Sequence, residues 1–462
     1  MFDKSIYKAR RERLRQDVGK GLILLMGNED SSMNYKDNLY PFRQDSSFLY
    51  FFGIDRPGLA ALIDSDNGKE VVFGNELTLD DIIWTGPQPS VSEQAERAGV
   101  SDTRPSAALT TELAAARGMG RAVHFLPPYR PENVLKLSAW LGYAPAAVRG
   151  HASVSLIKAV VSQRSIKSDE EVTQIEEAVD ITALMHAAAI RGARDGITEA
   201  QLAGVVHGTA ISAGGNLSFP TILTVNGQVL HNHYGHTVMH SGQIAICDSG
   251  AENRMHYAGD MTRTFPIGAR FTNLQRELYD IVLGAQEAAV AALRPGVFFR
   301  DVHALAAQKL VEGLKAVGIM KGDPAEAVAA GAHTMVFQCG LGHMMGLDVH
   351  DMEDLGEEYV GYDEDLKKST AFGWKSLRLA RRLEPGFVVT IEPGLYFIPE
   401  LMDRWGAEKK YGDFIDYGKL GALRKFGGIR IEEDLLITTE GSRLLGKPLA
   451  KTATAVEEMR GR

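Results

Sequence analysis

The chain has 462 residues, of which 45% are hydrophobic and 24% charged, as expected for a globular protein of two or three domains. Its net charge of −9 argues against nucleic acid as the main partner, because a phosphate-binding surface needs clustered positive charge. Two cysteines are too few for a disulfide framework. No secretory signal core and no apolar run near the ~18 residues that span a bilayer is apparent, so a cytoplasmic protein without a membrane partner is expected.

Short apolar runs alternate with helical stretches through the first 160 residues. Strands are predicted at 22–26, 60–63 and 71–73, where Gly, Asp and Asn bound the apolar runs, and helices around 90–99 and 132–141. Strands that alternate with helices predict an α/β domain.

A domain boundary is predicted near residues 162–168. Ser168 and Glu171 have the spacing of a capping box, and apolar residues then recur every three or four positions as far as Ile190. This pattern predicts a long helix with one buried face, which Gly196 is expected to end.

Three further helices are predicted after this one. Thr198 and Gln201 repeat the capping-box spacing, and the other two helices are expected at about 273–293 and 301–317. Pairs of helices therefore precede each block of strands.

Two aspartates, Asp248 and Asp260, flank a short polar connection between two predicted strands. Gln243–Asp248 and Met261–Phe265 both look like strands, and a hairpin between them would place the two carboxylates side by side. A lone Asp is usually a turn or cap residue. Here Asp248 ends an apolar strand and Asp260 is followed by a strand rather than by turn residues, so both charges need a compensating partner.

Two glutamates lie in strand-like runs, Glu392 in TIEPGLYF and Glu432 in GGIRIEEDLLIT. On a strand, Arg430 and Glu432 would share a face. A buried glutamate is costly unless it is paired or bound to a metal, and for Glu432 alone an ion pair with Arg430 is an equally good explanation.

His343 and His350 are separated by MMGLDV in a glycine-punctuated segment. A lone His is more often a satisfied core residue, but two of them among four acidic residues indicate a ligand and a proton carrier. Two divalent ions would cancel four carboxylate charges, whereas a single ion would force some carboxylates to protonate. The oxygen-rich set, which suits Mn²⁺ better than soft metals, comprises Asp248, Asp260, His343, Glu392 and Glu432.

These motifs, in this order, resemble the pita-bread metallopeptidases, and among them the proline-specific branch of aminopeptidase P and prolidase. The run FRQDSSFLYFFGI resembles the start of both enzymes, and KSLRLARRLEPGFVVTIEPGLYF and FGGIRIEEDLLIT resemble prolidase. The resemblance implies an α+β fold, with a pita-bread (creatinase/aminopeptidase) catalytic domain at 164–462 and a smaller aminopeptidase P-like α/β domain at 1–163.

The resemblance also implies an activity and a metal pair. The activity is hydrolysis of the Xaa-Pro bond at the N-terminus of short proline-containing peptides, by a homo-oligomer that binds two divalent ions, Mn²⁺ first and Co²⁺ or Zn²⁺ as alternatives. Asp260 and Glu432 would bridge the ions, Asp248 would bind one, and His343 and Glu392 the other. Glu392 would also act as general base.

Further roles follow from the same resemblance. His350 would help to hold the substrate carbonyl and stabilise the tetrahedral intermediate. Arg430 would orient Glu432 and also bind substrate, because its counterpart in prolidases lies near the substrate carboxylate. Arg378 matches an arginine that receives the free carboxylate of a dipeptide in prolidases, although a surface helix would explain it equally well.

Four positions remain open at this stage. His231 and His233 both fit the upstream histidine of the family; His231, slightly favoured, would act in catalysis and His233 in substrate binding. Cys339 replaces a histidine that the family often has four positions before its ligand histidine. Trp84 matches an aromatic that in aminopeptidase P reaches a neighbouring subunit's site, but an ordinary half-buried Trp is an equal explanation.

Two alternatives concern the activity itself. Arg378 and the long interval between Glu392 and Glu432 slightly favour a dipeptidase, whereas the N-terminal domain fits an aminopeptidase equally well. Some pita-bread proteins are metal-free binding modules, and creatinase works without metal, but such relatives lack several of the ligands that this chain keeps.

Overall fold

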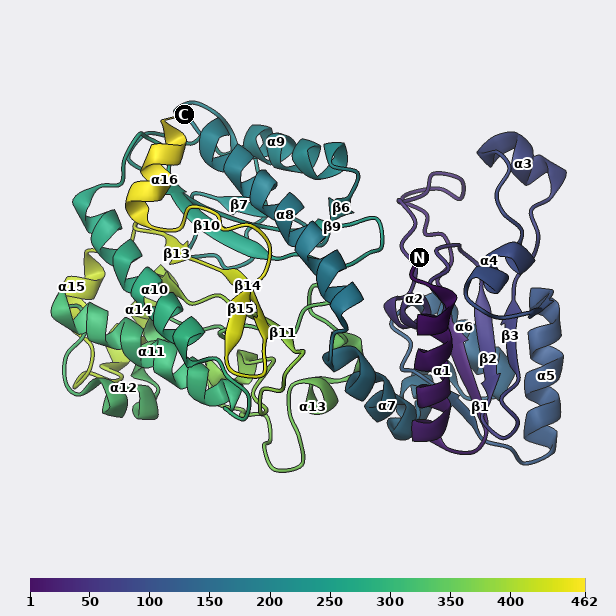
Figure 1. Cartoon of the computed structure of the whole chain (residues 1–462). Helices are drawn as coiled ribbons and strands as arrows, with labels where there is room; N and C mark the ends of the chain where they lie inside the picture. The colour runs from purple at the N-terminus through teal and green to yellow at the C-terminus, as the bar shows by residue number, and fades with distance from the viewer. Residues whose placement is uncertain (462) are drawn as a thin grey trace. The chain divides into compact units, whose positions relative to one another are not determined.

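The computed structural model describes residues 1–461 and divides into two compact units (Figure 1). The first comprises Met1–Arg164 with Met352–Tyr359, and the second comprises Ser165–Asp351 with the chain from Val360 onward. In the described part of the chain, no helix is long and apolar enough to cross a bilayer.

The first unit is a five-stranded mixed sheet with helices on its faces, in the order β4-β3-β2-β1-β5. β1 runs antiparallel to β2 and parallel to β5. Alternate side chains of β1 take opposite faces, so Leu22 and Leu24 pack with Leu113 of α5 and Leu137 of α6. The strands are Leu22–Met26 (β1), Ala60–Asp64 (β2), Glu70–Phe73 (β3), Asp102–Arg104 (β4) and Val123–Phe125 (β5). The α-helices are Lys4–Val18 (α1), Ser46–Phe52 (α2), Leu79–Thr85 (α3), Val91–Arg97 (α4), Ser106–Gly118 (α5), Pro131–Leu141 (α6), Val154–Ser165 (α7) and Glu357–Val360 (α13), and the 3-10 helices are Pro145–His151 (η1) and Glu353–Leu355 (η3).

Helices enclose the strands of the second unit, and two of them begin as predicted. The capping boxes of Ser168 and Thr198 both form, at the starts of α8 and α9. The prediction for the end of α8 was wrong, because the helix stops at Gly192 and Gly196 lies four residues beyond it at φ 81°. The α-helices are Asp169–Gly192 (α8), Glu199–Ser212 (α9), Asn273–Ala292 (α10), Phe299–Ala316 (α11), Pro324–Ala330 (α12), Pro399–Glu408 (α14), Tyr417–Gly421 (α15) and Ala453–Arg460 (α16), and the 3-10 helices are Ala332–Met335 (η2) and Trp374–Ser376 (η4).

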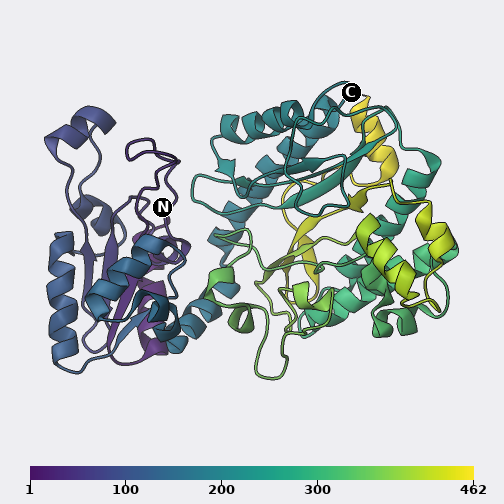
Figure 2. The same ribbon diagram turned by 180° about the vertical axis from the view of Figure 1, so that it is seen from behind.

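The strands of this unit form small antiparallel sheets. The orders are β10-β8-β7, β11-β14-β15, β12-β13 and β6-β9. In Figure 1, α8 lies in front of the β10-β8-β7 sheet, and in the opposite view of Figure 2 that sheet lies in front of the helix. The strands are Asn216–Leu217 (β6), Ile222–Thr224 (β7), Ile244–Ser249 (β8), Ala251–Glu252 (β9), Met261–Pro266 (β10), Val388–Ile391 (β11), Gly394–Tyr396 (β12), Gly428–Arg430 (β13), Glu433–Ile437 (β14) and Ser442–Leu444 (β15).

The predicted pairing of the two aspartate-bearing strands is confirmed, with Asp248 of β8 opposite Thr262 of β10. The backbones approach closely just beyond this pair, because a Cβ added at Gly250 would lie 1.9 Å from the carbonyl oxygen of Gly259. A side chain at Gly250 would therefore push Asp260 and the start of β10 away from β8, which carries Asp248.

Two buried histidines, His303 of α11 and His333 of η2, form a cluster with aromatic rings in the second unit. His303 of α11 contacts the rings of His333, Phe337 and Trp374, with centroids 4.8–6.3 Å apart. Burial lowers the pKa of His303 to about 3 and that of His333 to about 4. Both side chains are therefore neutral in the folded protein at pH 5, whereas an unfolded histidine is protonated there.

We expect this cluster to make the protein acid-sensitive. These histidines take up protons near pH 6.5 in the unfolded chain but not in the folded cluster. The free energy of unfolding is therefore unaffected by them above pH 6.5, and below it decreases by about 1.4 kcal/mol per pH unit for each histidine. A His303→Leu variant should show a shallower loss between pH 6.5 and 5. Urea midpoints followed by tryptophan fluorescence at pH 7.5, 6 and 5 test this, and parallel pH curves for variant and wild type would contradict it.

Candidate functional site

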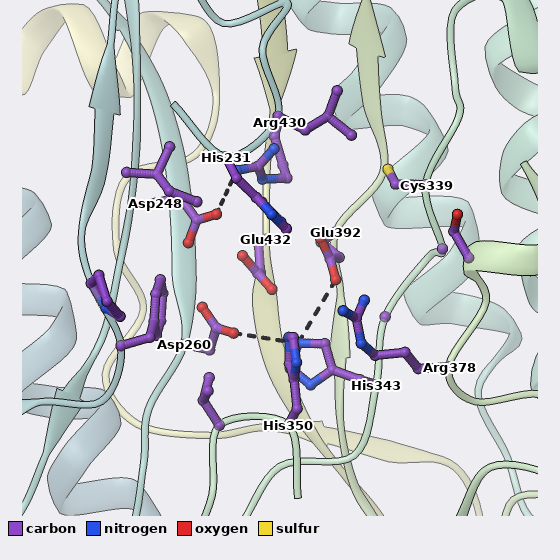
Figure 3. Close-up of a pocket in the computed structure, with 18 of the residues that line it drawn as sticks. His231, Asp248, Asp260, Cys339, His343, His350, Arg378, Glu392, Arg430 and Glu432 are labelled. Atoms are coloured by element: carbon purple, nitrogen blue, oxygen red, sulfur yellow. Dashed lines mark hydrogen bonds and ion pairs between the residues drawn. The ribbon is translucent and has the colours of Figure 1, made fainter. Parts of the chain in front are cut away.

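A cavity of about 260 Å³ lies inside the second unit (Figure 3). Its lining includes all the residues to which the sequence analysis gave a catalytic, binding or metal-ligating role. These are His231, His233, Asp248, Asp260, His343, His350, Arg378, Glu392, Arg430 and Glu432. The positions span 202 residues of sequence from His231 to Glu432, so the fold alone brings them together.

Three of the five expected metal ligands form a tight group. Asp260, His343 and Glu432 each offer a ligand atom, and these atoms all lie within 4.8 Å of one another. His343 Nε2 is 3.4 Å from an oxygen of Asp260 and 3.8 Å from an oxygen of Glu392. Asp248 and Glu392 line the same cavity beside this group.

The main chain around Glu432 differs from the prediction of one continuous strand. β13 ends at Arg430 and β14 begins at Glu433, so Glu432 lies at the break between two sheets. Its N–H donates to the carbonyl of Thr262 at 3.1 Å, which ties the break to β10. Glu432 therefore faces the cavity from a position where the chain changes sheets.

Arg430 contacts Asp248 rather than Glu432. Its Nη2 donates to Asp248 Oδ2, its Nη1 donates to the Tyr396 hydroxyl at 2.8 Å, and its Nε donates to Thr262 Oγ1 at 3.1 Å. Thr262 in turn donates to Glu432 Oε2 at 2.7 Å. The expected orienting effect on Glu432 is therefore relayed by the Thr262 hydroxyl.

Two residues that the sequence analysis did not single out as ligand supports hold the backbone of the ligands. Thr390 Oγ1 accepts the N–H of His343 at 3.1 Å, and the carbonyl of His343 accepts the Thr390 N–H at 3.0 Å. The fully buried Asp434 accepts the N–H of Asp260 at 3.1 Å. An acidic residue two positions after Glu432 in an apolar strand was the available signal for Asp434.

Glycine permits the contact between His343 and Thr390. A Cβ added at Gly342 would lie 2.0 Å from the carbonyl oxygen of Thr390. Any other residue at this position would therefore displace the segment that carries His343.

The cavity makes ionised carboxylates unfavourable in the protein alone. Burial, followed by repulsion from Asp248, holds the pKa of Asp260 well above its usual range. Burial and repulsion from Asp260 do the same to the pKa of Glu432. Burial raises the pKa of Glu392 to about 7, against the lowering effects of His343 and Arg430.

These observations fit a site for divalent cations. Asp260 Oδ1 is buried, and no hydrogen-bond partner for it exists among residues 1–461. A carboxylate oxygen in that position needs a cation or a proton. The donor set of oxygens with one imidazole nitrogen suits hard or borderline ions such as Mn²⁺ and Zn²⁺.

The two histidines expected to serve the substrate, His231 and His233, occupy different surroundings in the cavity wall. Figure 3 shows His231 pointing among Asp248, Arg430 and Glu432. Burial, with Arg430 next, lowers the pKa of His231. His233 Nδ1 lies 3.1 Å from the carbonyl oxygen of Thr221, so one of its nitrogens is engaged with the main chain. This arrangement favours His231 as the histidine that faces the substrate.

Three of the remaining residues lie at the cavity, and Trp84 lies on the surface of the first unit. His350 stacks edge-on against His343, with ring centroids 4.3 Å apart, and Arg378 and Cys339 line the cavity. Burial raises the pKa of the Cys339 thiol to about 12, so the thiol is neutral. Trp84 is 86% exposed on α3, which contradicts the expectation of an ordinary half-buried Trp.

Two family models match the chain. That of metallopeptidase family M24 matches residues 173–439, and that of the aminopeptidase P N-terminal domain matches residues 7–124. The chain belongs to metallopeptidase family M24. The M24 match covers the ligand set and the cavity, and the two matches together support a pita-bread unit preceded by a smaller domain.

Named relatives place the chain on the proline-specific branch of family M24. It is 30% identical to the human Xaa-Pro dipeptidase, over 94% of this chain and 88% of the relative. It is also 30% identical to the Xaa-Pro aminopeptidase of Escherichia coli strain K12, over 98% of this chain and 97% of the relative.

Solved structures agree with this placement. A structure of E. coli aminopeptidase P in complex with substrate superposes with a TM-score of 0.82 at 29% identity, covering 100% of this chain and 98% of that one. Zn-substituted E. coli aminopeptidase P in complex with product gives a TM-score of 0.80 at 28% identity, with the same coverage.

We expect Glu432→Gln to stabilise the metal-free protein and to weaken its response to metal. The substitution removes a charge that burial and Asp260 make unfavourable, while the amide oxygen can still accept from Thr262. Thermal midpoints in chelator and in excess Mn²⁺, with metal content by elemental analysis, measure both effects. Glu287→Gln on the exposed face of α10 is the matched control. A Mn²⁺-induced shift as large as that of wild type would remove Glu432 from the ligand set.

Proposed function

We propose that this M24 protein is a dinuclear metal-dependent exopeptidase that hydrolyses the Xaa-Pro bond at the N-terminus of short proline-containing peptides. The observation that carries the proposal is the convergence of Asp248, Asp260, His343, Glu392 and Glu432 on one cavity. The full-length similarity to enzymes named Xaa-Pro aminopeptidase and Xaa-Pro dipeptidase supports the choice of substrate.

Asp260 and Glu432 would hold two ions jointly, Asp248 would bind one of them, and His343 with Glu392 the other. The Asp248 oxygen that accepts from Arg430 has a second lone pair, so the bond to Arg430 is compatible with metal binding. The bound ions would supply an activated water and polarise the scissile carbonyl.

The protein's own groups would move the proton and hold the substrate. Glu392 would accept a proton from the attacking water and deliver it to the proline nitrogen, which leaves as a secondary amine. The raised pKa of Glu392, about 7 in the protein alone, suits a group that both accepts and returns a proton. His350 would donate to the carbonyl oxygen as negative charge develops on it, and His231 would bind the substrate beside it.

The finer properties are also proposals. Mn²⁺ remains the preferred ion, and a cytoplasmic location remains the expectation. Three large apolar side chains of the short helix α3 are exposed, namely Leu79, Ile83 and Trp84. A group of exposed apolar residues often marks a protein–protein interface, so it supports a homo-oligomer.

A metal-free binding module is disfavoured by the complete ligand set, and elemental analysis that finds no bound metal would restore it.

A dipeptidase must bind the free terminal carboxylate of its dipeptide substrate, whereas an aminopeptidase accepts peptides that continue beyond the proline. The cavity position of Arg378 supports the dipeptidase, because a guanidinium can bind a carboxylate through two hydrogen bonds. The comparable identity to both named classes leaves this choice to kinetics.

We expect Ala-Pro to be cleaved more efficiently than Ala-Pro-Ala, and Arg378→Ala to raise KM for Ala-Pro about tenfold to a hundredfold while leaving Ala-Pro-Ala nearly unchanged. Steady-state kinetics with added Mn²⁺ measure both. Arg382→Ala, four positions further along and exposed, is the matched control. Equal losses on the two substrates would show that Arg378 does not bind the terminal carboxylate, and efficient tripeptide cleavage by wild type would favour the aminopeptidase.

A further inference from the structure

Glu199 is a buried acidic residue outside the catalytic cavity. It is the first residue of α9 and its exposed fraction is 2%. Thr198 already caps this helix through the Gln201 N–H, so the Glu199 side chain is available for other contacts. A buried carboxylate is unfavourable unless hydrogen-bond donors surround it.

The donors come from the two ends of one irregular segment. Glu199 Oε1 accepts from Thr224 Oγ1 at 2.9 Å and from the Val225 N–H at 3.0 Å, and Oε2 accepts from the Gly235 N–H at 3.1 Å. The helix start adds a backbone bond to the same region, from the Glu199 N–H to the carbonyl of Thr237 at 3.0 Å. One carboxylate therefore clamps the segment 225–235 at both ends.

Thr224 extends this clamp into the middle of the segment. The Thr224 hydroxyl donates its only proton to Glu199 Oε1. The Thr224 oxygen is then left to accept from the Asn226 N–H at 2.9 Å and from the Asn232 side-chain amide at 2.8 Å. Thr224 is fully buried, so water does not compete for these bonds.

The segment held in this way carries the substrate-facing histidines. Asn232 lies between His231 and His233, and both histidines line the cavity. Both histidines are partly exposed to solvent, and the segment has no regular secondary structure apart from an isolated bridge at His233. Its conformation therefore depends on anchors such as Glu199, because exposed irregular segments are otherwise mobile.

We propose that Glu199 and Thr224 are positioning residues for His231. The pair holds the 225–235 segment so that the His231 ring stays in the cavity beside Asp248 and Arg430. Glu199 and Thr224 line no part of the cavity as the structure describes it, so they act on the substrate through the segment and not directly. The proposal rests on the proposed function in one respect, namely that His231 binds the substrate.

Substitutions can break the clamp without changing its shape. In Glu199→Gln, an amide NH₂ replaces one acceptor and faces an N–H or hydroxyl donor. Thr224→Val removes the hydroxyl at equal volume, whereas Thr224→Ser keeps it. We expect Glu199→Gln and Thr224→Val to raise KM for an Ala-Pro peptide about tenfold, with kcat close to that of wild type and unchanged Mn²⁺ content; a tenfold change corresponds to about 1.4 kcal/mol. Thr224→Ser and the exposed control Glu287→Gln should resemble wild type.

A double-substitution cycle shows whether the pair acts through His231. In a His231→Ala background, Glu199→Gln should have almost no further effect on KM, because the group that it positions is gone. A tenfold loss in both backgrounds, or a Thr224→Ser variant as impaired as Thr224→Val, would overturn the proposal.

Amide hydrogen exchange followed by mass spectrometry tests the clamp without any turnover. Exchange over residues 225–237 should quicken in Glu199→Gln and Thr224→Val, while the β8 and β10 strands remain as protected as in wild type. Unchanged exchange over 225–237 would sink the inference. If wild type cleaves no Xaa-Pro peptide, the proposed function fails, and the exchange experiment still decides whether Glu199 anchors the segment.

Discussion

The mutual repulsion of carboxylates buried in one cavity is the constraint on which the rest of this structure depends. Burial and neighbouring charge raise the pKa values of Asp260, Glu392 and Glu432, so the protein alone disfavours the ionised forms. The bond from Arg430 to Asp248 compensates one charge within the chain. The remaining charges can be balanced only by cations or by protons. Without bound cations, the carboxylates of this cavity can stay buried only if some of them are protonated.

Like charges in one cavity repel one another, so their positions must be fixed by neighbouring groups. Threonine hydroxyls provide several of these contacts. Thr262 links Arg430 to Glu432, and Thr390 binds the main chain of His343. Each threonine lies on a strand next to a ligand-bearing position, so the sheets set the spacing of the ligands. The contacts are made within the buried interior, where hydrogen bonds resist competition from water.

The cavity has a rigid side and a more exposed side. Asp248 lies on β8 and Asp260 directly precedes β10, and these two paired strands are buried along their length. His231, in contrast, comes from an irregular segment whose order depends on the carboxylate of Glu199 and the hydroxyl of Thr224. Expected metal ligands on or directly beside buried strands, with expected substrate contacts on an anchored segment, would suit a site that keeps its ions while peptides enter and leave.

The sequence by itself determined which residues meet at the site and most of the elements that carry them. Acidic residues inside apolar strands are unusual enough to be read one at a time, and capping boxes such as that of Ser168 depend only on neighbours in the chain. Only the tertiary structure decided that Arg430 binds Asp248, that Glu432 lies between two strands, and that Glu199 anchors the segment of His231. Those outcomes depend on contacts between residues 25 to 182 positions apart, and no local pattern carries information about such distances.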